Sequence, residues 1–172
     1  MPLMRVEEGP VEGGRAALVA DPFTTLADDQ ALPEAGGAIV SLTRFRKDRE
    51  TLLARNAPIG VRLKSDESPE QIGDDVHRLS VVAIEFPAFR DGRGFSWARL
   101  LRTRLKFKGE VRAVGAFLYD QIAYQHRVGF DGWELPEGFT VETFNRALGE
   151  ITNVYQPSAD GRKTIRELRA GK

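Results

Sequence analysis

Short apolar runs alternate with segments of helical periodicity from residue 38 onward. The runs are of a length typical of single buried strands. They predict strands over residues 38–42, 59–63, 81–86, 110–114 and 132–135. Between them, apolar side chains recur at intervals of three and four residues, which is typical of helices packed on one face. These segments predict helices over residues 44–55, 68–79, 93–105, 118–128 and 140–151.

Strands that alternate with helices indicate βαβ crossovers and a mostly parallel sheet. The units recur roughly every 20–25 residues, which resembles the repeat of a TIM barrel, but a complete barrel needs about 250 residues. The chain has 172 residues. We therefore predict an α/β fold of repeated βα units, with a mostly parallel sheet that forms a partial, TIM-barrel-like structure. An open doubly wound sheet is the alternative.

Four of the predicted strands carry a single charged residue between apolar neighbours: Arg62, Glu85, Arg112 and Glu134. Alternation places each charge on the face opposite to its neighbours. An open sheet covered on both faces would bury these charges under helices, which costs free energy. In a barrel-like sheet they would share one concave face, and we expect this arrangement. The alternative is that charges at strand ends simply meet solvent.

The composition divides the chain into three parts. Residues 1–37 are rich in glycine, proline and acidic residues, and predict a flexible N-terminal arm. Residues 38–155 form the predicted α/β domain, and residues 156–172 form a basic C-terminal tail.

The loop after the strand 81–86 is the first candidate site, because parallel α/β folds bind ligands at the carboxyl ends of their strands. Asp91, Gly92 and Arg93 open the following helix. Backbone N–H groups at a helix start, next to an arginine, suit an oxyanion. The alternative is an ordinary glycine turn with Asp91 as its cap. Asp120 joins this candidate binding set, with the four strand charges, because it begins the next helix, where a carboxylate is favourable. No catalytic residue is identified.

A basic patch is expected on the helix after this loop. Arg99 and Arg102 share a helix edge at a spacing of three residues, and Lys106 follows them. Such a patch is either a solvated face or a surface that docks a partner.

Composition and charge exclude several functional classes. Lysine plus arginine and aspartate plus glutamate number 25 each, so the chain lacks the basic footprint of a nucleic-acid-binding protein. It has no apolar run long enough to span a membrane and no visible signal peptide, so we expect a cytoplasmic protein. Without cysteine, and with two histidines in no metal-ligand spacing, neither an iron–sulfur cluster nor a metal is expected. A flavin stays open.

Several motifs together resemble a bacterial family called domain of unknown function 934. They are FPxFxDGRGFSxARLLR at 86–102, GEVRAVG at 109–115, DQ at 120–121 and RxGFD at 127–131. The family is encoded beside assimilatory sulfite reductase, so the resemblance implies a role in sulfate assimilation at the sulfite-reduction step. It supplies no established catalytic residues.

Two functional hypotheses follow. The first is an accessory protein that docks sulfite reductase or its electron donor, or assists assembly of the reductase. The second is a small-anion or flavin-type enzyme of the same pathway, with Glu85 or Asp91 as acid/base and Arg93 and Arg112 as anion ligands. Whether the chain is an enzyme stays open. Under either hypothesis we expect a homodimer, because a partial barrel has sheet edges that must be covered.

Overall fold

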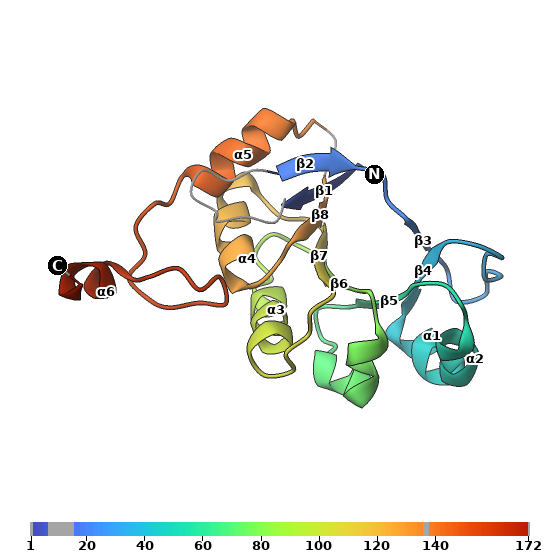
Figure 1. Cartoon of the computed structure of the whole chain (residues 1–172). Coiled ribbons are helices and arrows are strands. Elements are labelled where there is room, and N and C mark those ends of the chain that lie inside the picture. The colour runs from blue at the N-terminus through green and yellow to red at the C-terminus, as the bar shows by residue number, and fades with distance from the viewer. Residues whose placement is uncertain (1, 7–15, 136–137, 172) are drawn as a thin grey trace.

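The computed structural model describes residues 2–6, 16–135 and 138–171, which contain one eight-stranded sheet with helices on one side (Figure 1). The strands are β1 (Leu3–Val6), β2 (Ala16–Val19), β3 (Phe23–Thr25), β4 (Gly37–Ser41), β5 (Ile59–Leu63), β6 (Val81–Phe86), β7 (Glu110–Gly115) and β8 (Gly132–Glu134). The helices are α1 (Leu42–Lys47), α2 (Arg49–Ala54), α3 (Arg93–Thr103), α4 (Ile122–Val128), α5 (Val141–Gly149) and α6 (Ile165–Ala170), with 3-10 segments η1 (Pro69–Arg78) and η2 (Tyr119–Gln121).

The sheet order is β2-β1-β8-β7-β6-β5-β4-β3. Strands β3 to β8 run parallel to their neighbours, whereas β1 pairs antiparallel with both β8 and β2. The sheet curls into a half-barrel, with the helices on its outer side and the connection from β2 to β3 crossing its open side (Figure 1). The predicted partial barrel is therefore confirmed, in preference to the open doubly wound sheet.

The sheet carries an apolar layer on each of its two faces. The outward layer packs under the helices and forms the main core, in which Val61, Ile84 and Ala113 share one cluster with Leu101 and Phe144 from the helices. The concave layer is smaller. It contains Ile39, Val81, Ala83 and Val114, with Phe23 packed against them.

The four strand charges share the concave face. Register aligns Arg62 with Ala83, and Ala83 with Arg112, so the two arginines point to the same side of the sheet. Glu85 forms an ion pair with Arg62 at 3.4 Å, and Glu134 lies at the same distance from Arg112. The prediction that alternation gathers these charges on one face is confirmed.

The N-terminal arm predicted over residues 1–37 is wrong for the part that the structure describes. β1, β2 and β3 belong to the sheet, and the side chains of Leu3 and Met4 are fully buried. These strands have only three or four residues each, too few for periodicity to reveal them. Residues 1 and 7–15 of the predicted arm lie outside the described residues.

The predicted basic tail starts as a loop held against α4. Arg127 of α4 donates hydrogen bonds to the Asp160 carboxylate at 3.0 Å and to the Gln156 carbonyl at 2.7 Å. The segment then ends in α6, which has no buried residue. Across all the residues described, no helix has the length and apolar character that a membrane crossing requires.

Replacing Met4 with alanine tests whether β1 is part of the folded core. Truncation of a buried methionine costs about 2–5 kcal/mol, because it leaves a cavity and removes apolar burial. We expect Met4→Ala to lower the free energy of unfolding by that amount in urea denaturation. Leu18→Ala on β2, where half of the side chain is exposed, is the control and should cost less than about 1 kcal/mol. Equally small effects from both changes would show that β1 contributes nothing to the core.

Candidate functional site

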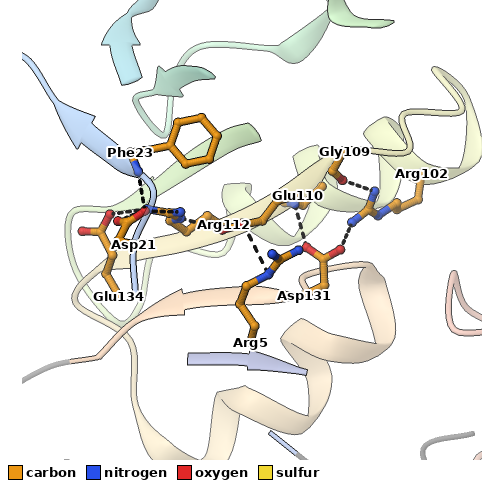
Figure 2. A network of polar contacts seen from close by, with 10 residues as sticks. Arg5, Asp21, Phe23, Arg102, Gly109, Glu110, Arg112, Asp131 and Glu134 are labelled. Atoms are coloured by element: carbon orange, nitrogen blue, oxygen red, sulfur yellow. Dashed lines mark hydrogen bonds and ion pairs between the residues drawn. The ribbon is translucent and has the colours of Figure 1, made fainter. Parts of the chain in front are cut away.

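A fully buried arginine lies at the centre of the concave face, surrounded by carboxylates (Figure 2). Arg112 donates to both carboxylate oxygens of Asp21, at 2.7 and 3.0 Å. It also donates to Glu110 Oε1 at 2.6 Å and to Glu134 Oε1 at 3.4 Å. The ring of Phe23 lies 5.7 Å from the guanidinium carbon. Asp21 lies on the connection that crosses the open side of the half-barrel, so this contact ties that connection to β7.

Burial alone would lower the pKa of the Arg112 guanidinium, because desolvation disfavours its charged form. The hydrogen bonds that Arg112 donates to Asp21 and Glu110, together with the charges of these carboxylates, outweigh the burial and raise the pKa above the ordinary arginine value. Arg112 is therefore a permanent cation whose donors are engaged by the protein itself.

The polar network continues from Glu110 to the neighbouring strands. Arg5 of β1 lies 3.5 Å from Glu110. On the other side, Asp131 accepts from the Val111 backbone N–H at 2.7 Å and from Arg102 Nη2 at 2.7 Å (Figure 2). Sequence reasoning missed Asp21, Glu110 and Arg5. Alternation could have found Glu110, because it stands two residues before Arg112 on the same strand.

Arg62 and Glu85 form the more accessible pair of the strand charges. About a third of each side chain is exposed, whereas Arg112 has no exposed surface. Both residues lie near the carboxyl ends of their strands, where parallel α/β folds place ligands.

The loop after β6 is closed by an internal ion pair. Arg93 donates to both oxygens of Asp91, at 3.0 and 2.7 Å, and also to the Ser65 hydroxyl at 2.8 Å. This pairing lowers the pKa of Asp91 well below its ordinary value. Gly92, the N-cap of α3, has an ordinary negative φ of −85°. The Asp91 carboxylate also accepts from the Arg93 backbone N–H at 3.2 Å, so the geometry favours the capped turn over an oxyanion site.

The remaining candidates do not join these residues. Asp120 is exposed in η2, and Arg99 and Lys106 are exposed on α3 and in the turn after it. The expectation that Arg102 shares this surface is wrong. Its guanidinium turns inward and donates to the carbonyls of Gly129, Phe107 and Gly109, in addition to Asp131. Those carbonyls fix the turns beside β7 and β8, so Arg102 is a structural residue.

A group of exposed apolar side chains lies over the strand-end loops. We call Phe89, Leu118 and Tyr124 the strand-end patch, and each is about half exposed. The side chain of Gln121 joins the loops, because it donates to the Phe89 carbonyl at 2.7 Å and accepts from the Leu118 N–H at 3.0 Å. The Tyr124 ring contacts Phe95 with centroids 5.1 Å apart. Sequence reasoning missed this patch, since periodicity alone does not show which apolar loop residues stay exposed.

Metal-binding groups are not assembled in the part of the chain that the structure describes, where no three His, Cys, Asp or Glu residues are placed to hold an ion. His126 lies at the end of α4, with Nδ1 3.1 Å from the Phe130 carbonyl. Its Nε2 is buried and has no hydrogen-bond partner among the described residues. Burial lowers the pKa of His126 below the ordinary value.

Comparison with known families gives one match. A family described as a bacterial protein of unknown function (DUF934) matches residues 60–166, which is more than half of the chain. The match contains every candidate residue named from the sequence, but not Asp21 or Arg5. No curated protein and no solved structure is significantly similar to the chain.

Removing the charge of Arg112 is expected to destabilise the fold strongly. Arg112→Met keeps a long apolar stem but removes the cation that three carboxylates share, and breaking a buried pair in this way costs about 3–5 kcal/mol. Urea denaturation measures this loss. Arg104→Met removes an exposed arginine paired with Glu70 and should change stability by about 0.5 kcal/mol or less. Similar losses in both variants would contradict a central role for Arg112.

The partial burial of His126 predicts a pH-dependent stability. Because its pKa is lowered by folding, the unfolded chain takes up the proton first as the pH falls below about 6.5. The free energy of unfolding should then fall toward the folded pKa, by up to about 1.4 kcal/mol per pH unit. His126→Asn, whose amide can still donate to the Phe130 carbonyl, should flatten this slope in urea denaturation between pH 7.5 and 5.5. Equal slopes in His126→Asn and the wild type would refute the assignment.

Proposed function

Because the chain belongs to the bacterial family of unknown function DUF934, we propose that it is an accessory protein of assimilatory sulfate and sulfite reduction. The association of this family with sulfite reductase, inferred from the sequence resemblance, supplies the pathway. In this proposal the protein works in the cytoplasm, and it docks sulfite reductase or the electron donor of that enzyme, or assists assembly of the enzyme.

The charge states of Asp91 and Arg112 support docking over catalysis. General acid–base catalysis is most effective when a group has a pKa near the working pH. The ion pair with Arg93 lowers the pKa of Asp91, and the carboxylates around Arg112 raise the pKa of its guanidinium. These groups keep their charges at neutral pH, and their hydrogen bonds are already made within the protein.

The strand-end patch is the single observation that carries the proposal. Phe89, Leu118 and Tyr124 expose apolar surface on the same end of the half-barrel as the ion pair of Asp91 and Arg93. Aromatic side chains and arginines are enriched at the centres of protein interfaces. Arg90 directly follows Phe89 in the chain, and Arg99 lies one helical turn after Phe95. Both arginine side chains are exposed. An apolar centre flanked by arginines suits a protein partner.

A second candidate function rests on the pair of Arg62 and Glu85. Their partial exposure at the strand ends supports a small-anion or flavin-type enzyme of the same pathway. Purified protein with the absorption of a bound flavin would favour this candidate over docking.

We also propose a homodimer, because each edge strand of the sheet is paired on one side only. β2 and β3 each have one neighbour, and β2 carries the exposed side chains of Leu18 and Val19. A second copy that covers these side chains would protect an edge open to non-specific pairing.

The strand-end patch can be tested with a double variant. Phe89→Ser with Leu118→Ser removes two exposed apolar side chains and should leave the melting temperature unchanged. Loss of interface anchors should weaken binding to purified sulfite reductase at least about tenfold, as measured by biolayer interferometry. In a deletion strain, this variant should fail to restore growth on sulfate and sulfite, while growth on sulfide is normal.

Tyr155→Ser is the matched control, because Tyr155 is the most exposed of the large apolar side chains that the structure describes and lies outside the patch. It should bind the reductase and restore growth like the wild type. Normal growth of the deletion strain on sulfate, or wild-type binding by the double variant, would refute the proposal.

A further inference from the structure

An open pocket of about 210 Å³ lies at the amino-terminal ends of β5 and β6, opposite the strand-end patch. Its polar lining comes from Arg55, Arg78 and Ser80, and its apolar lining includes Leu52, Leu53 and Ile59. No aspartate or glutamate contributes to the lining. The pocket is therefore cationic, with an aliphatic wall.

The charge of Arg78 is paired only weakly, with a single carboxylate at long distance. Its Nη2 donates to the Leu53 carbonyl at 3.2 Å. The carboxylate of Asp75 is 3.9 Å from its Nη1, and the Arg49 guanidinium already engages both oxygens of that carboxylate. About half of the Arg78 side chain is exposed, so a ligand can reach it.

The guanidinium of Arg55 has unused donors in the same region. Its Nη2 donates to the carbonyls of Pro33 and Gly36, at 2.9 and 3.3 Å. Its Nη1 is buried and finds no hydrogen-bond acceptor, and no carboxylate lies within ion-pair distance of Arg55 in the described part of the chain. A buried donor without an acceptor is costly, and because Arg55 lines the pocket, an acceptor brought by a ligand would relieve that cost.

Two guanidinium groups and a hydroxyl are the donors that proteins use for carboxylate, sulfate and phosphate groups. The wall formed by Leu52, Leu53 and Ile59 can contact a short apolar group beside the anion. We propose that this pocket binds a small organic oxyanion, in which a carboxylate, sulfate or phosphate group is carried on a short aliphatic body. Arg78 and Arg55 bind the anionic group, and Ser80 donates its hydroxyl. This site is independent of the strand-end patch and of the proposed docking function.

Isothermal titration calorimetry at constant ionic strength tests the site, with inorganic phosphate, sulfate, butyrate and propyl phosphate as probes. We expect saturable binding, tighter for propyl phosphate than for inorganic phosphate, because the aliphatic wall adds apolar contact. Arg78→Ala should weaken binding about tenfold or more, since it removes charge-assisted hydrogen bonds. About half of the Arg78 side chain is exposed and its one ion pair is long, so this variant should keep the wild-type melting temperature.

Arg104→Ala is the matched control, because Arg104 is an exposed arginine that does not line the pocket. It should bind every probe like the wild type. Amide chemical shifts in NMR spectra locate the binding: signals of Ile59 and Ser80 should move with added probe, and those of Phe89 and Leu118 should not. The absence of saturable binding by all probes, equal affinities of the Arg78 and Arg104 variants, or shifts only outside the pocket would overturn the proposal.

Discussion

The ion cluster around Arg112 holds the curled sheet together. Its carboxylates come from three places: Glu110 on the same strand, Glu134 on β8, and Asp21 on the connection that crosses the open side (Figure 2). Glu110 also reaches Arg5 on β1. A buried arginine is tolerated only when its charge and hydrogen bonds are satisfied. The requirement to satisfy Arg112 therefore favours the curled sheet with its crossing connection, because that connection brings Asp21 to the carboxylates of β7 and β8.

This cluster separates the two ends of the half-barrel. The concave middle is filled by Arg112, its carboxylates and the small apolar layer with Phe23, so little room is left there for a ligand. The exposed groups that can contact a partner or a ligand lie instead at the two ends of the half-barrel. Apolar side chains are exposed over the loops that follow the strands, and two arginines line a pocket below the strand starts. One scaffold can thus present two unlike surfaces without a path between them.

The order of apolar runs and helical segments, with the single charges inside the strands, was enough to predict the parallel part of the sheet and its curvature. The charges of Arg62 and Arg112 share a face because alternation is a property of each strand, and it can be read without knowing the partners. Contacts between distant segments could not be read in this way. Asp21 meets Arg112 across 91 residues, and helix spacing places Arg102 beside Arg99 without showing that Arg102 turns inward. The Asp91 turn was weighed correctly as an alternative, but its closure by Ser65 depends on a neighbouring loop.

The position of β1 between β8 and β2 has a consequence for the order in which the protein assembles. The ribosome makes β1 and β2 well before β8, the strand that β1 needs as its neighbour. The hydrogen bonds between Ala16 and Asn145, which fasten β2 to α5, join residues 129 apart. Pairings of such long range form late, because the chain must close a large loop first. The βα units can accordingly form as they emerge, whereas β1 and β2, although synthesised before these units, are fixed after them.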